Sequence, residues 1–395
     1  MNLLLKNGNI DVLIDNGLIG AVGSGLESEN ARIIDCTGLT VIPGIFDMHV
    51  HLRDPGQTHK EDIFSGCEAA ATGGVTAVMC MPNTTPALDN LDLLNNFLTR
   101  CADENVKTRV YPCAAITKGL KSLEITDFAE LKKAGAVAVS DDGMPVSDTR
   151  IMSEALKLAA ENKLAIISHC EYNGVDSRLS ENLITARELC LAERFNVPVH
   201  IAHVSTKEAV EYIEIAKSRG IKVTCEATPH HFTLDNSVLE KEDADYKMNP
   251  PLREKDDIAA VIKGLQNGVI DCIASDHAPH TPDEKAAFTN APNGVLGLET
   301  ILAVTLTRLF HTGLLPLERV IELLCVNPRQ ILGISGGVLQ AGSIADIAAI
   351  DLNEEWVVEL DKLCSKSKNT CFKGMKLKGK NKLTIVNGRI VYNGI

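Results

Sequence analysis

Apolar runs of strand length alternate with amphipathic segments of helix length through the middle of the chain. The first strand lies in the stretch 41–56 and ends in His49-Val50-His51; the others are expected at 75–81, 109–116, 136–139, 164–167, 197–202, 221–225 and 269–274. Helical periodicity fills the intervals, at about 61–71, 90–104, 124–134, 149–161, 181–195, 206–219 and 256–267. Eight strand-then-helix units predict an α/β fold in which a parallel sheet closes into a (β/α)8 barrel of the TIM type.

The two ends of the chain show a different pattern, in which short alternating pieces are separated by Asn-Gly turns. These turns fall at 7–8, 16–17 and 387–388, and C-terminal strands are expected at 345–352 and 383–391. Asn-Gly between alternating residues is a hairpin signal. We therefore expect a small β-sandwich module built from both chain termini, residues 1–43 and 338–395, beside a barrel over 44–337.

The main alternative to the barrel is an open, doubly wound sheet that binds a dinucleotide. That fold requires Gly-x-Gly-x-x-Gly after its first strand, and the residues after His51 do not contain it. Polar residues instead follow the ends of several strands, which is where a parallel barrel forms its active site. The pattern favours the barrel.

Composition narrows the classes of partner. The chain has 395 residues, 45% of them hydrophobic, which suffices for a barrel with a smaller module and excludes a disordered chain. Its formal net charge of −13 argues against nucleic acid or an anionic membrane as partner. Lysines concentrate only at 373–382, where a solvated loop is expected.

Cysteine spacing and the absence of long apolar runs bear on location. The 12 cysteines are scattered singly without a Cys-x-x-Cys pair, which fits a reducing compartment. The apolar run at the N-terminus is too short for a signal peptide, and no run approaches the roughly 18 residues of a membrane span. We expect a cytoplasmic protein that acts on a small molecule.

Histidine and aspartate residues recur at the strand ends. In a strand, residues two apart point the same way, so His49 and His51 can reach one metal ion. One ion takes only three or four protein ligands, and the chain offers more than that, so the pattern predicts a binuclear site. The candidate ligands are His49, His51, Asp142, His169, His203 and Asp276.

Two divalent ions held close together repel each other unless an anion lies between them. Some barrel hydrolases use a carbamylated lysine, but the run 136–143 contains none, and Lys132 and Lys133 precede the strand at its opposite end. Asp142 is the candidate for the bridging carboxylate, and the adjacent Asp141 is expected to be a turn residue.

Short segments at the strand ends carry a more specific signal. They are His49-Val-His51-Leu-Arg53-Asp-Pro-Gly, Met81-Pro-Asn83-Thr, Ser140-Asp-Asp142-Gly, Ser168-His169-Cys-Glu, Ile201-Ala-His203-Val-Ser-Thr-Lys, Tyr246-Lys-Met-Asn249-Pro-Pro-Leu-Arg and Ala274-Ser-Asp276-His-Ala-Pro-His280. Together they resemble the dihydroorotase family, in its class I bacterial branch within the amidohydrolase superfamily. The resemblance covers nearly the whole chain.

The resemblance implies zinc-dependent, reversible cyclisation of N-carbamoyl-L-aspartate to L-dihydroorotate in pyrimidine synthesis, and a possible homodimer. It implies two zinc ions, one on His49, His51 and Asp276 and one on His169 and His203, with Asp142 bridging. Asp276 matches the catalytic acid/base. Residues implied to contact substrate are His51, Arg53, Asn83, Asn249, His280, Asn293 and Gly294, of which Arg53, Asn83 and His280 match residues that hold its carboxylate.

Two departures from the family pattern stand out. The chain between His169 and His203 lacks a longer insertion, which leaves 172–180 as a short loop, and Pro292-Asn293-Gly294 replaces Pro-Phe-Gly. Neither removes a ligand. The alternatives are another cyclic-amide hydrolase, such as a dihydropyrimidinase, hydantoinase or allantoinase, and a non-catalytic dihydroorotase-like scaffold.

Overall fold

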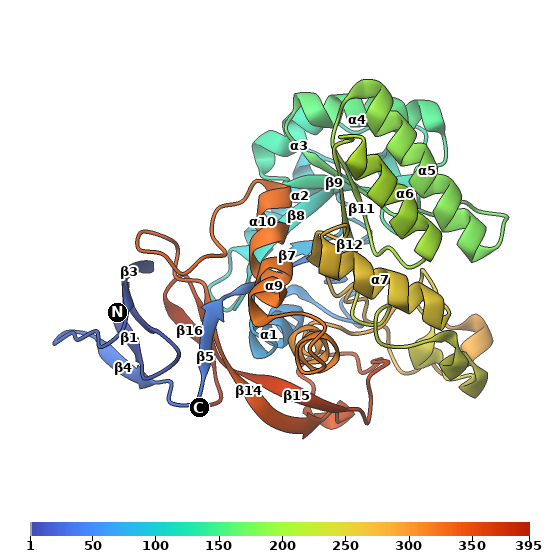
Figure 1. Cartoon of the computed structure of the whole chain (residues 1–395). Helices are drawn as coiled ribbons and strands as arrows, with labels where there is room; N and C mark the ends of the chain where they lie inside the picture. Colours follow the sequence, from blue (N-terminus) through green and yellow to red (C-terminus); the bar gives the residue numbers. More distant parts are fainter. Residues whose placement is uncertain (1) are drawn as a thin grey trace.

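A computed structural model describes residues 2–395 and contains a nearly closed barrel of eight parallel strands (Figure 1). Neighbouring strands follow the chain order from β6 to β13. The strands are β6 (Ile45–Val50), β7 (Val75–Cys80), β8 (Arg109–Ala115), β9 (Ala138–Ser140), β10 (Ala165–Ser168), β11 (Val199–Ile201), β12 (Val223–Ala227) and β13 (Cys272–Ile273). Val50 pairs with His277, just beyond β13, and this bridge closes the ring.

Helices cover the outside of the barrel and connect its strands. They are α1 (Ile63–Thr72), α2 (Leu91–Cys101), α3 (Phe128–Ala134), α4 (Thr149–Glu161), α5 (Ser177–Phe195), α6 (Lys207–Ser218) and α7 (Lys255–Asn267), with α8 (Ile301–Thr305), α9 (Leu317–Ile321) and α10 (Asn327–Leu332) after β13. Side chains cap the first six by accepting a backbone N–H: Asp62, Asn90, Asp127, Asp148, Asp176 and Thr206. Such caps satisfy donors that a helix start leaves free. Within residues 2–395, no helix is both long and apolar enough to cross a membrane.

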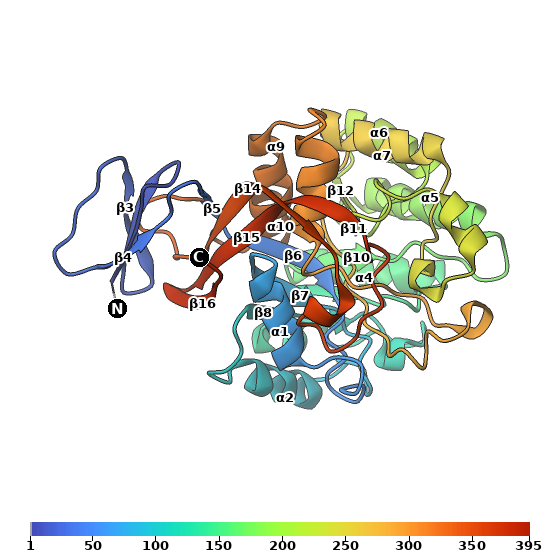
Figure 2. The same cartoon turned by 90° about the horizontal axis from the view of Figure 1, so that it is seen from below.

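The termini form two four-stranded sheets that share one apolar core. One contains β1 (Leu3–Lys6), β2 (Asp11–Asp15), β3 (Leu18–Gly23) and β4 (Arg32–Asp35), and the other contains β5 (Thr40–Pro43), β14 (Ile347–Val357), β15 (Lys376–Val386) and β16 (Arg389–Asn393). Leu3, Ile14, Ile347 and Ile385 are among the buried side chains between the sheets. Figure 2 shows β14 and β15 lying between the N-terminal sheet and the barrel. The β-sandwich built from both termini is confirmed.

The apolar stretch at 41–50 forms two strands rather than the single strand that its hydrophobicity predicts. β5 pairs with β14 of the sandwich, whereas β6 is the first strand of the barrel. Gly44 separates them, and its backbone N–H donates to Asp346 O. A Cβ at this position would lie 2.2 Å from Thr76, so the turn between the sheets requires glycine. Continuous hydrophobicity does not reveal the break, because both strands are buried.

The lysine-rich run at 373–382 was expected to be a solvated loop, and that prediction was wrong for most of its length. It lies in β15, where Leu377 and Leu383 are buried. The lysines project from the other face, and Lys380 and Lys382 each pair with Glu354 on the neighbouring β14. Alternation of lysine with buried residues is the two-residue period of a half-buried strand, and lysine content alone obscured it.

Between β14 and β15 the chain leaves the sandwich and packs on the barrel. We call residues 359–375 the C-terminal excursion. Ser365 donates a hydrogen bond to Glu61 at the start of α1, and Asn369 bonds the loop after β13. Both attachment points lie at the same end of the barrel, beyond the carboxyl ends of its strands. The excursion therefore supports loops that surround the mouth of the barrel.

Candidate active site

A cavity of about 220 Å³ lies at the carboxyl ends of the barrel strands. It is lined by His51, Arg53, Asn83, Asp142, Gly143, His169, His203, Asn249, Asp276, Ala278, His280, Asn293 and Gly294. The structure thus brings together every predicted site residue except His49 on one surface, and His49 lies buried beneath it. The cavity is smaller than the roughly 300–1,000 Å³ typical of drug-sized ligands, so it suits a small molecule.

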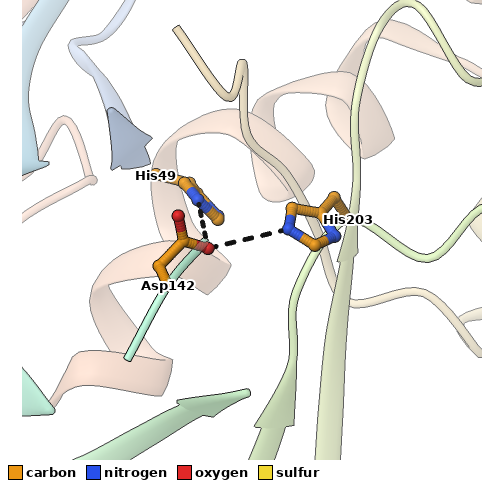
Figure 3. A group of neighbouring side chains, drawn as sticks. All are labelled: His49, Asp142 and His203. Atoms are coloured by element: carbon orange, nitrogen blue, oxygen red, sulfur yellow. Dashed lines mark ion pairs between the residues drawn. The ribbon is translucent and has the colours of Figure 1, made fainter. Parts of the chain in front are cut away.

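Asp142 occupies the centre of the histidine cluster (Figure 3). Its Oδ1 lies 3.2 Å from His49 Nε2, 3.4 Å from His169 Nδ1 and 3.7 Å from His203 Nε2. Its Oδ2 lies 3.5 Å from His51 Nε2. One carboxylate therefore faces all four imidazoles, which is the position a bridging ligand needs.

Asp276 completes the cluster from the end of β13. Its Oδ1 lies 3.1 Å from His51 Nε2 and 3.7 Å from His49 Nε2. Ligand atoms of His49, His51 and Asp276 lie within 4.8 Å of one another, and the same holds for His49, Asp142 and His203. Within residues 2–395 the site therefore contains two overlapping groups of potential metal ligands.

Oxygen acceptors hold three of the histidines in a defined orientation. Nδ1 of His49 lies 2.6 Å from Glu226 Oε1, and Nδ1 of His51 lies 2.8 Å from Asn83 Oδ1. In His169 the roles are reversed: Nε2 lies 3.1 Å from Glu171 Oε2, and Nδ1 faces Asp142.

An oxygen acceptor requires the N–H of the nitrogen that contacts it, so the other nitrogen of each ring keeps its lone pair. In all three rings that free nitrogen points to the central carboxylate. His49 Nε2 and Asp142 Oδ1 have no hydrogen-bond partner among the described residues, although both are buried. Imidazole lone pairs facing a carboxylate form a donor set that fits divalent cations.

The neighbouring histidines stabilise the negative charges of Asp142 and Asp276. Burial favours the neutral form of Asp142, but His49, His169 and His203 outweigh it and hold its pKa well below the usual value. Burial likewise opposes ionisation of Asp276, and His51 and His49 lower its pKa. Both carboxylates are therefore ionised, as metal ligands must be.

Three site residues have positive φ angles, in the left-handed region that side chains other than glycine rarely adopt. The angles are 60° for Arg53, 33° for His203 and 50° for Asp276. Strained backbone of this kind persists where the surrounding structure holds it, and it concentrates at functional sites. Here it lets the chain turn sharply out of β6, β11 and β13 while the side chains remain at the cavity.

Glu226 was missed by sequence reasoning. It lies in β12, is fully buried, and contacts His49 through Oε1 and His200 Nε2 through Oε2 at 3.3 Å. Burial opposes its ionisation, but His49 and His200 lower its pKa. The available signal was the position of Glu226 directly after the predicted strand 221–225, between Cys225 and Ala227. An unpaired charge would be costly in a buried strand end, so a partner for this carboxylate is expected.

Two of the predicted carboxylate-binding residues, Arg53 and His280, lie side by side on one wall of the cavity. Arg53 is buried and lies with Nη2 3.2 Å from His280 Nε2. The same Nε2 lies 2.9 Å from Asn293 O. One imidazole nitrogen is either a donor or an acceptor, so it cannot bond both partners at once. A ligand carboxylate could accept from the guanidinium and from an imidazole N–H together.

Other polar residues near the mouth have structural partners. Asp141 accepts from Thr117, in agreement with its expected role as a turn residue. His231 contacts Thr228 and Pro250 O, and His277 Nδ1 accepts from the N–H groups of Gly297 and Leu298. None of these lies among the metal-ligand groups of the described chain.

Comparison with known proteins agrees with this geometry. Residues 40–391 match the family model described as Amidohydrolase family. The chain is 45% identical to a dihydroorotase of Trichlorobacter lovleyi over an alignment of 426 positions, which covers 100% of both chains. It is 44% identical to a dihydroorotase of Acetivibrio thermocellus, with 98% of this chain and 95% of the relative covered.

Solved structures show the same architecture. An L-hydantoinase (dihydropyrimidinase) from Arthrobacter aurescens superimposes with a TM-score of 0.91 at 28% identity, covering 100% of this chain and 96% of the other. A dihydropyrimidinase from Brevibacillus agri gives a TM-score of 0.89 at 23% identity and therefore supports the fold alone. The sequence relatives are closer in identity than these structures. The chain thus belongs to the amidohydrolase family and, within it, to the cyclic amide hydrolases of the dihydroorotase group.

Proposed function

We propose that this protein catalyses the reversible cyclisation of N-carbamoyl-L-aspartate to L-dihydroorotate, the dihydroorotase step of pyrimidine (UMP) synthesis. The observation that supports this best is the pairing, in one small cavity, of the histidine–aspartate cluster with the buried Arg53 and His280. The cluster suits amide chemistry. The two cationic or N–H-bearing side chains suit an anionic substrate. Full-length relatives at 44–45% identity named dihydroorotase support the same reaction.

We propose two zinc ions per subunit. His49, His51 and Asp276 would hold one, His169 and His203 the other, and Asp142 would bridge them. When bound, such a pair polarises a carbonyl and lowers the pKa of water. The support is that ring nitrogens and two ionised aspartates converge in a buried space, where His49 Nε2 and Asp142 Oδ1 have no hydrogen-bond partner among the described residues.

Arg53 and His280 would bind the carboxylate that substrate and product share. A guanidinium can bind a carboxylate through two parallel N–H bonds, and this orients the ring as well as attracting it. Asn83 and Asn249 line the same cavity, and their amides would contact the substrate beside it. Asn293 and Gly294 would contribute through the backbone, since the Asn293 carbonyl already faces His280.

Asp276 would act as the catalytic acid/base. In the hydrolytic direction its carboxylate would accept a proton from the attacking water and deliver it to the departing ring nitrogen. In the synthetic direction it would take that proton from the ureido nitrogen as this nitrogen attacks the side-chain carboxyl group, and give it to the carboxyl oxygen that leaves as water. Its position over the cavity beside His51 supports this role, because it is the carboxylate nearest the open side of the cluster.

The second candidate is hydrolysis of hydantoins or dihydropyrimidines, which the structural neighbours' names suggest. These rings lack the carboxylate of dihydroorotate, so an enzyme for them does not need a buried arginine facing the cavity. A non-catalytic scaffold is disfavoured because the full set of ligand candidates is present.

The decisive test is turnover by the zinc-loaded protein, measured in both directions with dihydroorotate and carbamoyl aspartate and alongside hydantoin and dihydrouracil. We expect activity only on the carboxylated pair. Replacement of Arg53 by Met should raise KM for dihydroorotate far more than it lowers kcat. Turnover of hydantoin or dihydrouracil without turnover of dihydroorotate would favour the second candidate.

Three further proposals concern the domain boundaries, the cellular location and the oligomeric state of the protein. We propose residues 1–43 and 338–395 as the sandwich module and 44–337 as the barrel, with the C-terminal excursion lying against the barrel. Unpaired cysteines throughout residues 2–395 support a cytoplasmic location. A homodimer stays a prediction, which light scattering of the purified protein would test.

A further inference from the structure

We propose that Asn369, in the C-terminal excursion, is a positioning residue for the carboxylate-binding wall of the active site. This inference rests on the proposed function. The excursion comes from the sandwich, and Asn369 does not line the cavity. It acts on the cavity through the loops that carry His280 and Gly294.

Asn369 joins two loops through its side chain. Its Oδ1 accepts from the backbone N–H of His280 at 3.0 Å. Its Nδ2 donates to Ala278 O at 3.2 Å and to Gly294 O at 3.0 Å. The backbone carbonyl of Asn369 accepts from Leu296 N at 3.0 Å. Every hydrogen-bonding group of the amide is thus used to hold the loop after β13 against the loop at 293–296.

The two loops meet at close range where Asn369 holds them. A Cβ on Gly294 would lie 2.7 Å from Ala278 O and 3.1 Å from His280 Cδ2. His280 Nε2 in turn lies 2.9 Å from Asn293 O and 3.2 Å from Arg53 Nη2. A shift of either loop would therefore change the distance between the imidazole and the guanidinium, which is the width of the proposed carboxylate site.

The same excursion also holds the loop that follows Arg53. Ser367 Oγ donates to Lys60 O at 2.7 Å, and Lys366 N donates to Glu61 Oε1 at 3.1 Å. Lys60 Nζ lies 3.4 Å from His280 Nδ1, so this loop contacts the imidazole from its other side. One short segment thus fixes both loops between which the substrate carboxylate would lie.

The environment of Asn369 makes the contact costly to lose. Asn369 is only 4% exposed, so removing its amide would leave an N–H and two carbonyl groups buried without their partner. It touches none of the proposed metal ligands. A positioning role therefore predicts that substrate binding suffers while metal binding does not.

The test compares Asn369→Ala and Asn369→Asp with the wild-type holoenzyme. Alanine removes all side-chain contacts. Aspartate keeps an acceptor for His280 N–H but places an oxygen against two carbonyls. Lys362→Met is the matched control, since it removes a side-chain contact within the same excursion, with Glu359, that holds neither loop.

We expect KM for dihydroorotate to rise about ten- to a hundredfold in both Asn369 variants. We expect kcat and zinc content to stay within about twofold, and Lys362→Met to behave as wild type. A fall in kcat with unchanged KM would overturn the proposal, because it would indicate a general loss of folded protein. So would an Asn369→Asp variant with the wild-type KM.

Hydrogen exchange of the holoproteins separates this inference from the proposed function. We expect faster exchange over 277–297 in Asn369→Ala, and unchanged exchange in peptides that contain His49 and His169. If the wild type does not turn over dihydroorotate, the proposed function fails. If exchange over 277–297 is unchanged in Asn369→Ala, the positioning role itself is overturned.

Discussion

His49 Nε2 lies 3.2 Å from Asp142 Oδ1, and neither buried atom has a hydrogen-bond partner within the described chain. The imidazole proton is on Nδ1, held by Glu226, so this contact joins a lone pair to a carboxylate oxygen. Two electron-rich atoms at that separation are unfavourable unless a positive charge is shared between them. In the ion-free protein a second proton on His49 can supply this positive charge. Burial lowers the pKa of His49, but Asp142 and Glu226 outweigh burial and raise it well above its usual value.

Metal removal should therefore both inactivate and destabilise the protein. Chelation leaves the carboxylates and imidazoles facing one another without the cation that relieves them. We expect Tm to fall by several degrees and turnover to disappear, with zinc restoring both. Elemental analysis should give about two ions per chain before chelation, as the proposed ligand set requires, and almost none after it. Full activity of a metal-free preparation would contradict the binuclear assignment.

Asp276→Asn should abolish proton transfer while disturbing the fold little. Asparagine has the same shape, but its amide is not a base, and general acid–base residues typically contribute about 10²–10⁴-fold to rate. We expect kcat to fall about a thousandfold and KM to change much less. Metal content must be measured on the same sample, since loss of one ion would offer a competing explanation.

Glu226→Gln tests the buried contact beneath His49. The amide keeps the size of the side chain but removes the charge that holds the Nδ1 proton. Partners of this kind typically affect metal affinity or activity about 10–100-fold. We expect zinc affinity to fall by that amount, as measured by competition with a chromophoric chelator. Glu171→Gln, at a partly exposed partner of His169, is the control and should weaken zinc binding less. Equal effects would argue against a special role for the buried glutamate.

Gly294→Ala should damage the carboxylate-binding wall. Gly294 has φ of 138°, and an added Cβ would lie 2.7 Å from Ala278 O. The loop must move, so we expect KM for dihydroorotate to rise at least about tenfold. Gly374→Ala is a suitable control, because Gly374 also has a positive φ of 72° but its Cβ would meet nothing within 4 Å. Similar KM values in the two variants would show that strain alone explains the effect.

His280 should make stability depend on pH. Burial, together with Arg53 and Lys60, lowers the pKa of His280 from 6.5 to about 3. Between these values the unfolded chain binds a proton that the folded protein does not, so stability rises with pH from about 3 to 6.5 and is lost as pH falls through that window. We expect Tm to drop less steeply between pH 6.5 and 4.5 in His280→Asn than in wild type. Parallel curves would show that His280 is not buried in neutral form.

The repeating pattern made the barrel predictable, and strand-end chemistry made its site predictable. All candidate ligands lie at strand ends, where parallel strands must bring them together. The seven predicted helices were placed to within a few residues, and α5 begins at Ser177 instead of 181, because Asp176 caps it. The helices α8, α9 and α10, after β13, were not predicted. β13 contains only Cys272 and Ile273 of the expected 269–274, since most of that apolar run is buried without pairing as strand.

Long-range contacts could not be predicted from local pattern. The partnership of Glu226 with His49 joins β12 to β6, and Asn369 reaches His280 from the segment between β14 and β15. In the sequence each is an ordinary polar residue, and only the fold identifies its partner. Gly44 is similar, because in the sequence it is one more small residue in an apolar run. Glycine is required there because a Cβ would collide with Thr76 on the neighbouring strand.

The order of the barrel and sandwich segments along the chain also sets an order of assembly during synthesis. The proposed metal ligands all precede residue 277, so the ribosome has made every one of them before β14 begins at Ile347. β5, in contrast, must wait for β14, its partner from the far end of the chain. Because chains fold as they emerge, the barrel can close around its histidines while the sandwich is still incomplete. The excursion that carries Asn369 emerges after all of these ligands, so the wall that recognises the substrate is the final part of the site to be fixed.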